Sequence, residues 1–141
     1  MDILKKYWKK ILISALFVAM AATMNAGMDE LDHHFEQSFA SEWNQQFWNP
    51  AISWQNKYIN HDVNQGRIKW NLLLFEVNKP VVFTDGWHLL KMFMIIFIVL
   101  SIAIWIKGKL YLKLIYFLLL GVVWNISFET FYSKILRKKK K

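Results

Sequence analysis

Three long apolar runs without a charged residue dominate this sequence. They cover residues 11–28, 92–106 and 114–128. A helix rises about 1.5 Å per residue, so about 20 apolar residues cross the hydrocarbon core of a bilayer. Hydrophobic residues make up 55% of the chain, more than a soluble domain of 141 residues usually carries. We therefore expect an all-α integral membrane protein.

The runs predict a single membrane domain over residues 1–141 with three transmembrane helices. The first span covers residues 11–28 and continues as a helix to about residue 39, because no proline interrupts it before Pro50. The second covers residues 80–106 and the third residues 110–132.

A cleaved signal peptide is the alternative reading of the first run, since basic residues precede it. Such a peptide needs a small residue two positions before the end of the leader. Met24 stands in that position relative to Ala26, so the cleavage site is poor and we favour a retained span.

An interfacial loop over residues 40–79 joins the first two spans. It is rich in Trp, Asn and Gln and contains no run long enough to cross a membrane. Aromatic rings with polar edges partition to the bilayer interface, so we expect an aromatic-rich cap there. The apolar piece at residues 70–75 is too short for a span and reads as an interfacial or re-entrant segment, which leaves room for a fourth, re-entrant crossing.

The start of the second span carries an ionisable pair, Asp85 and His88. If the helix begins at Pro80, which suits a first helical turn, this pair lies three residues apart within the membrane end of the span. Ionisable residues at that depth indicate a functional site. In the alternative reading the helix begins later, Asp85 is its N-cap and His88 lies at the headgroup level.

Three spans bring the end of the first, the start of the second and the end of the third to one membrane face. Carboxylates and imidazoles of these segments can meet there and hold a divalent metal ion, whose identity the sequence leaves open. The expected metal ligands are Asp29, Asp32, His33, His34, Asp85 and His88. Glu129, near the end of the third span, would be a further ligand or a catalytic general base. Mutual salt bridges and hydrogen bonds among these groups are the alternative.

The net charge of +8 would indicate nucleic acid in a soluble protein. Here the lysines flank the apolar runs, as membrane topology and anionic lipids require, so we expect lipid and no nucleic-acid partner. Lys57 and Arg67 in the loop would bind an anionic headgroup of a substrate. The polybasic tail, residues 134–141, favours a cytoplasmic C-terminus, although the basic N-terminal arm argues the reverse.

The string Asn-Pro-x-x-Ser-Trp-x-Asn-Lys-Tyr, at residues 49–58, resembles a family of uncharacterised small bacterial integral membrane proteins. The resemblance extends to Thr-Asp-Gly-Trp-His at residues 84–88 and covers most of residues 28–136. It implies the inner membrane of a bacterium and no particular activity. Residues 67–83 depart from the family by lacking its small hydroxylated residues.

These observations predict a metal-dependent membrane enzyme that acts on a lipid or lipid-linked substrate at the bilayer surface. A bound metal would activate water or polarise an ester or phosphoryl oxygen. The alternative is a non-catalytic membrane subunit or assembly factor of a larger complex. The absence of cysteine excludes thiol catalysis, and a site this small would also be completed by a second copy in a homo-oligomer.

Overall fold

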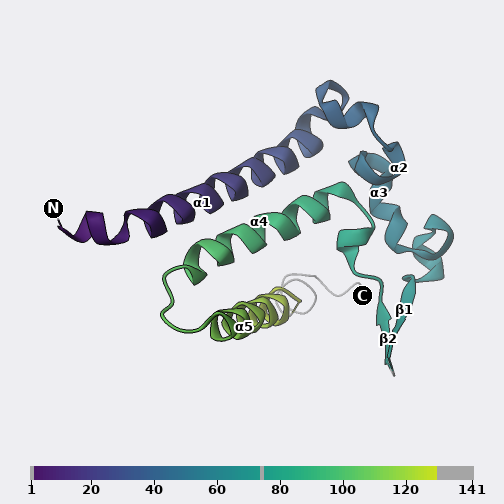
Figure 1. Ribbon diagram of the computed structural model, residues 1–141. Helices are drawn as coiled ribbons and strands as arrows, with labels where there is room; N and C mark the ends of the chain where they lie inside the picture. Colours follow the sequence, from purple (N-terminus) through teal and green to yellow (C-terminus); the bar gives the residue numbers. More distant parts are fainter. Residues whose placement is uncertain (1, 74, 130–141) are drawn as a thin grey trace. The chain divides into compact units, whose positions relative to one another are not determined.

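The computed structural model describes residues 2–73 and 75–129, and most of them are helical (Figure 1). The elements in chain order are α1 (Asp2–His34), α2 (Gln45–Trp48), α3 (Pro50–Ser53), β1 (Lys69–Leu72), β2 (Phe75–Asn78), α4 (Gly86–Ala103) and α5 (Leu110–Glu129). Short 3₁₀ turns connect α1 to α2, α3 to β1 and β2 to α4.

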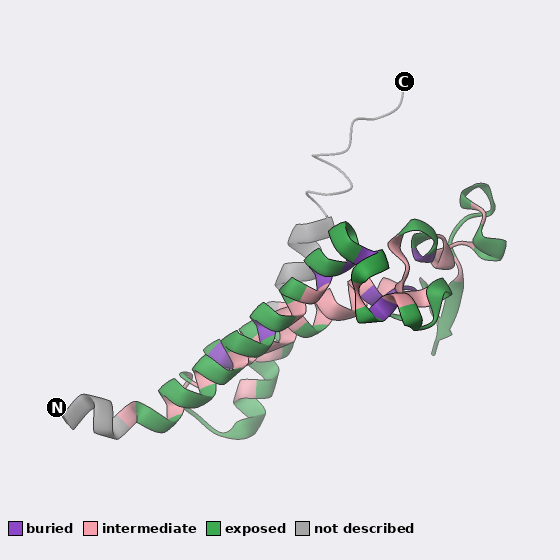
Figure 2. Ribbon diagram, turned by 90° about the horizontal axis from the view of Figure 1, so that it is seen from above, coloured by how far each residue is buried: buried purple, intermediate pink, exposed green. Residues whose placement is uncertain are grey.

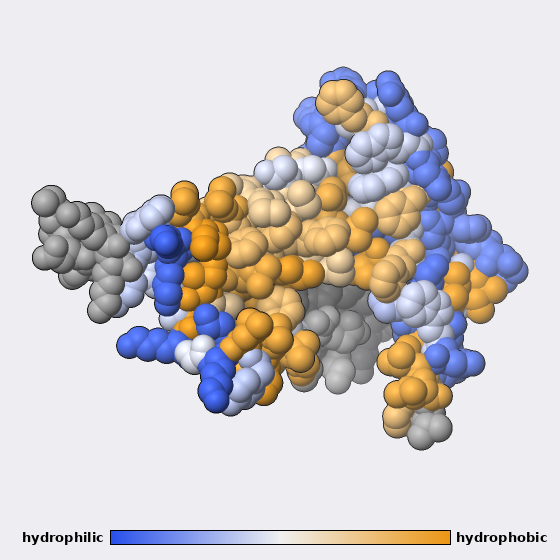
Figure 3. Space-filling view, in the orientation of Figure 1, coloured by the Kyte–Doolittle hydropathy of each residue, from blue (hydrophilic) through white to orange (hydrophobic). Residues whose placement is uncertain are grey.

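Two helical stretches are long and apolar enough to cross a membrane, Tyr7–Gln37 and Gly86–Ala103. They correspond to the first two predicted spans, and apolar side chains cover much of the helical surface in Figure 3. The third predicted span falls on α5, in which the described side chains form a shorter apolar helix, Leu110–Leu119. The third crossing therefore stays a prediction.

The chain divides into two compact units, each built from parts of the long helices. One combines Met1–Phe17 with Ile98–Lys141, and the other is Val18–Phe97. In the first unit the Ser14 hydroxyl donates a hydrogen bond to the Ser101 carbonyl oxygen at 3.1 Å. The rings of Tyr7 and Trp105 lie 6.2 Å apart between centroids. These contacts pair the N-terminal part of α1 with the C-terminal part of α4 and the turn that follows it.

In the second unit a small core joins the end of α1 to the start of α4. Leu31, Phe35 and Ala40 are buried together. Buried positions are sparse along the ribbon in Figure 2. The partly buried side chains packed against them are Trp48, Trp87 and Leu90. Gly27 allows the close approach of the two helices, because a Cβ atom there would lie 3.1 Å from Leu90 Cδ1.

The segment predicted as an interfacial loop is ordered but not purely helical. Pro50 begins α3, where a missing N–H costs nothing, and the Asn49 side chain caps this short helix through Ala51 N at 3.0 Å. Further along, β1 and β2 pair antiparallel, with Lys69 opposite Asn78 and Leu72 opposite Phe75. This hairpin departs from the all-α expectation and occupies the segment that the sequence analysis assigned to an interfacial or re-entrant piece.

The second long helix begins at Gly86, later than Pro80. Pro80 instead precedes a 3₁₀ turn, Val81–Phe83, and adopts an extended ψ of 132°. The N–H of Leu89 makes the first α-helical bond to the carbonyl of Asp85, at 3.2 Å. The structure thus follows the alternative in which Asp85 caps the helix and His88 lies in its first turn.

Candidate functional site

Asp85 is the buried residue on which the candidate site is built. Its Oδ1 accepts a hydrogen bond from the backbone N–H of His88 at 2.9 Å, the usual N-cap contact three residues into a helix. The Thr84 hydroxyl lies 3.2 Å from Oδ2. The side chain of Asp85 is only 4% exposed. The Thr84 hydroxyl donates to the Val81 carbonyl oxygen at 2.8 Å, so the backbone N–H of His88 is the cap donor to Asp85 at the start of α4.

The same carboxylate holds the ring of His88. The Nδ1 atom of His88 lies 2.7 Å from Oδ1 and 2.8 Å from Oδ2 of Asp85. A proton on Nδ1 donates to this carboxylate whether the imidazole is neutral or charged, so the contact selects one tautomer. In that tautomer the second ring nitrogen, Nε2, carries the lone pair. Since 33% of the His88 side chain is exposed, a substrate or ion can approach the ring.

Asn56 connects the aromatic loop to the backbone beside Asp85. Its Nδ2 donates to the carbonyl oxygen of Thr84 at 2.7 Å and to the carbonyl oxygen of Gln46 at 2.5 Å. The Gln46 side chain returns a bond to Asn56 Oδ1 at 2.6 Å. The Asn56 side chain therefore links α2, the turn after α3 and Thr84, just before the start of α4. These bonds hold the aromatic-rich loop against the helix start that carries Asp85.

The ring of Trp48 packs closely against the first residue of α4, Gly86. A Cβ atom added to Gly86 would overlap the ring of Trp48, with Cε3 as its nearest neighbour. Trp48 also makes edge contacts with Trp43 and Phe47, whose ring centroids lie 5.0 and 5.3 Å away. The glycine is required here by this close approach, so the aromatic cluster is fitted to the helix start that carries Asp85 and His88.

Trp87 links the site to the end of α1. Its Nε1 donates to Asp32 Oδ2 at 2.9 Å, a contact between residues far apart in the sequence. On its other side the ammonium of Lys91 lies 4.8 Å from the centroid of the Trp87 ring, within cation–π range. Asp32 is therefore brought next to the residue that precedes His88, as the predicted meeting of the first and second spans requires.

The remaining predicted metal ligands lie exposed along the end of α1. Asp29 accepts a hydrogen bond of 3.4 Å from Asn25, and the rings of His33 and His34 contact each other edge to face at 6.4 Å. Within residues 2–73 and 75–129 no three His, Asp or Glu side chains are grouped so that they could hold a metal ion. The side chain of Glu129, at the end of α5, lies outside the described residues.

In this conformation Asp85 is surrounded by protein hydrogen-bond donors, and its role as a metal ligand stays a prediction. Both of its oxygens already accept protein hydrogen bonds, two of them from His88. A histidine that binds a metal commonly donates its other N–H to such a carboxylate, so the geometry suits Asp85 as a positioning residue and His88 Nε2 as the reactive atom. The metal site as a whole stays a prediction.

The predicted headgroup-binding residues lie on two neighbouring segments. Tyr58 and Arg67 form an isolated antiparallel bridge, and the N–H of Ile68 donates to the carbonyl of Lys57 at 3.0 Å. The Lys57 ammonium lies 5.4 Å from the Tyr58 ring centroid. Lys57 directly follows Asn56, so its backbone is anchored by the network that supports Asp85.

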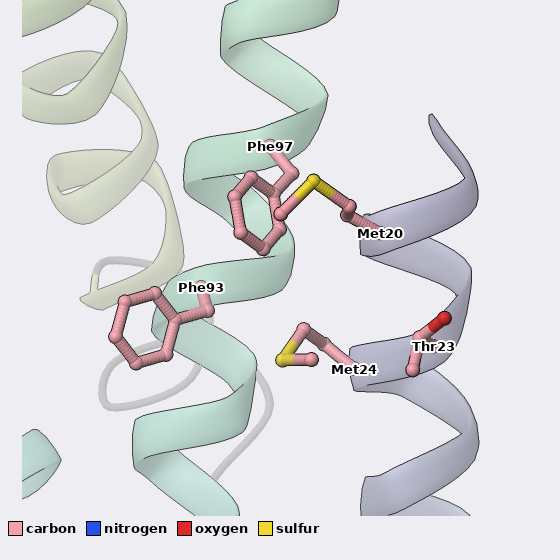
Figure 4. Close-up of a pocket in the computed structure, with 5 residues that line it drawn as sticks. All are labelled: Met20, Thr23, Met24, Phe93 and Phe97. Carbon is pink, nitrogen blue, oxygen red and sulfur yellow. The ribbon is translucent and has the colours of Figure 1, made fainter. Parts of the chain in front are cut away.

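An apolar groove lies between α1 and α4 deeper in the same unit. It has a volume of about 330 Å³ and is open along one side. Met20, Thr23 and Met24 of α1 and Phe93 and Phe97 of α4 line it, and Figure 4 shows Met20 and Met24 extending from α1 toward α4. The Thr23 hydroxyl donates to the carbonyl of Ala19 in its own helix at 3.0 Å, so the lining offers hydrocarbon and sulfur to a ligand.

Four residues that support the site were not among the predicted site residues: Trp48, Asn56, Thr84 and Gly86. Asn56, Thr84 and Gly86 lie in the two strings at residues 49–58 and 84–88, and Trp48 directly precedes the first string. The strings were a signal that these residues matter, but the contact between them could not be read from spacing. Comparison of the chain with protein-family models, with curated proteins and with solved structures finds no match.

Proposed function

We propose that this chain is an integral membrane protein of a bacterial inner membrane and that it acts as an enzyme on a lipid or lipid-linked group at the bilayer surface. In this proposal His88 is the catalytic residue, and Asp85 is the residue that positions it. Two helices with membrane-spanning length and composition support the membrane location.

The observation that carries the proposal is the contact of His88 Nδ1 with both oxygens of a carboxylate that is 4% exposed. A carboxylate held in this way orients the ring and stabilises the imidazolium that forms when Nε2 takes a proton. Nε2 would accept a proton from a water or hydroxyl group as it attacks an ester or phosphoryl centre, and would then return it to the leaving group.

A lipid substrate would account for two further features of the unit Val18–Phe97, the apolar groove and the cations on the loop. Its acyl chain would lie in the groove formed by α1 and α4 (Figure 4), which contains Met20 and Phe93. Its anionic headgroup would meet the cations Lys57 and Arg67 on the loop. A scissile bond between these two parts of the lipid would come near the first turn of α4, where His88 lies.

Turnover of labelled lipid tests the proposal. The purified chain is reconstituted in vesicles of bacterial polar lipids that carry ¹⁴C in the acyl chains and ³²P in the headgroups, and products are separated by chromatography. Wild-type protein should release a labelled product, and His88→Gln should abolish release. Asp85→Asn should slow it by about 10²–10⁴-fold, the range expected for loss of an oriented acid–base group.

The matched control is His34→Gln, which changes an exposed imidazole on α1. If His88 acts by proton transfer alone, this variant keeps wild-type turnover and the wild-type protein holds no stoichiometric metal. If Asp32→Asn and His34→Gln lose turnover together with a divalent metal bound by the wild type, the predicted metal site is correct. Folded wild-type protein that turns over no labelled lipid contradicts the enzyme proposal.

One observation favours the second candidate, a non-catalytic subunit or assembly factor. Within the described part of the chain every buried side-chain nitrogen or oxygen has a hydrogen-bond partner, so the network needs no ligand to complete it. In that case His88→Gln would lower the stability of the folded protein, and neither the variant nor the wild type would turn over lipid.

A further inference from the structure

The β1–β2 hairpin ends in a cluster of exposed apolar side chains. The exposed fractions are 61% for Leu72, 96% for Leu73 and 73% for Phe75. In Figure 3 the hairpin, at the lower right as in Figure 1, is strongly hydrophobic toward its tip. Water-exposed hairpin tips normally carry turn-forming polar residues, so this tip is unusual for a surface in contact with water.

The backbone of the turn makes the choice of residue more unusual. Leu73 has a φ of 55°, in the left-handed region that Gly, Asn and Asp adopt with least strain. A leucine there is unfavourable for the turn itself and places a large apolar side chain directly after the end of β1. A residue that is poor for local structure and poor for contact with water indicates a function that requires an apolar group at this position.

Positive charges flank the base of the hairpin. From Arg67 to Lys79 the sequence contains three cations and one anion, a net charge of +2. The anion, Glu76, is already paired with Lys69 at 2.6 Å across the two strands. Arg67 is exposed and Lys79 is partly exposed. An apolar tip above a cationic base matches the order of acyl chains and anionic headgroups at a bilayer surface.

We propose that the tip of the β1–β2 hairpin inserts into the headgroup–acyl boundary of an anionic lipid bilayer. Insertion is shallow, because a two-stranded sheet has open edges whose N–H and C=O groups hydrocarbon cannot satisfy. The hairpin acts as a lateral anchor for the unit Val18–Phe97. This anchoring is independent of any chemistry at His88.

The absence of cysteine from the chain allows a direct test. Leu73→Cys, labelled with the environment-sensitive fluorophore NBD, reports from the tip, and Asn64→Cys labelled in the same way is the control on an exposed turn. Both full-length proteins are reconstituted in vesicles with and without phosphatidylglycerol. The tip label should shift to shorter emission wavelength, resist quenching by iodide in the buffer and be quenched by a nitroxide placed shallowly on a lipid chain. The control label should be quenched by iodide alone.

Leu73→Asn separates insertion from folding, because asparagine suits the left-handed turn better than leucine. In this variant a label at Phe75→Cys should lose its protection from iodide while the thermal unfolding of the protein is unchanged or improved. The proposal would be overturned if iodide quenched the Leu73→Cys label, or the Phe75→Cys label in a chain that keeps Leu73, in anionic vesicles. Protection that persists in detergent and depends on protein concentration would assign the tip to a contact between copies and would overturn it too.

Discussion

At the residue scale, the site depends on side chains whose value lies in their fit to one neighbour. Asn56 bonds two backbone carbonyls on different segments, and Gly86 leaves room for the ring of Trp48. The importance of such residues cannot be predicted from residue type or spacing. Their contacts form only when residues 47–58 and residues 84–88 come together in the folded chain. Asp85 and His88, by contrast, could be selected from the sequence because ionisable residues beside an apolar run are costly.

The fit between Gly86 and Trp48 predicts the effect of a single methyl group. Gly86→Ala should lower the free energy of unfolding by about 1–3 kcal/mol, as expected when a packed contact is overfilled. The loss occurs although alanine is the better helix former. Gly121→Ala in α5 is the control, since a Cβ atom there would meet no atom of the described side chains within 4 Å. It should raise stability by roughly 0.5–1 kcal/mol.

Denaturant unfolding in detergent, followed by tryptophan fluorescence, measures both variants. Equal stability of the two variants would show that Trp48 does not lie against Gly86. Trp48→Leu combined with Gly86→Ala should recover part of the loss, because the smaller side chain vacates the space that the methyl group needs.

At the element scale, the sequence predicted the long helices better than the segment between them. The apolar runs located α1 and α4, but Pro80 indicated a helix start that the structure places at Gly86. The residues after Pro80 form a 3₁₀ turn, and the α-helix begins only after Asp85, whose side chain caps it. The N-cap at Asp85 therefore sets the helix start, although a proline also suits a first helical turn. The β1–β2 hairpin was missed because its turn residue, Leu73, is not one that marks turns in sequences.

Substitutions of Asp85, the N-cap of α4, should affect the stability of the protein and its lipid turnover differently. Serine is about as good an N-cap as aspartate, so Asp85→Ser should change the free energy of unfolding by less than about 1 kcal/mol, whereas Asp85→Ala should cost about 1–2 kcal/mol. A serine hydroxyl cannot replace the two-oxygen contact with His88 Nδ1. Turnover of labelled lipid should therefore fall in both variants while thermal unfolding separates them. Full turnover in Asp85→Ser would remove Asp85 from the proposed mechanism.

At the scale of the whole molecule, the number of membrane crossings decides which polar groups share a face. Two helices have the required length and composition, and the third crossing rests on α5 and on residues beyond those described. The predicted partner role of Glu129 depends on that third crossing. The shared face of the His and carboxylate residues stays a prediction. The distances between these residues could not be predicted, because they are set by contacts such as that of Trp87 with Asp32.

Topology reporters test the three-span arrangement. With three spans the loop and the tail share a side that holds ten Lys and Arg residues, against seven lysines on the other side. The positive-inside rule then predicts that a reporter fused after Lys141 and one inserted after Asn64 both report the cytoplasm. A periplasmic report from the tail would reverse the orientation. Reports from opposite sides would show that the chain crosses the membrane one time more or fewer.

The central claim is that a buried Asp85 fixes the His88 ring with its proton on Nδ1 and its lone pair on Nε2. Nitrogen NMR of the protein with ¹⁵N-labelled histidine rings tests it most directly, at a pH where the imidazoles are neutral, with His88→Gln used to assign the signals. We expect a protonated Nδ1 and an unprotonated Nε2 for His88, and loss of this preference in Asp85→Asn. A wild-type His88 protonated on Nε2, or one whose signals do not change in Asp85→Asn, would contradict it.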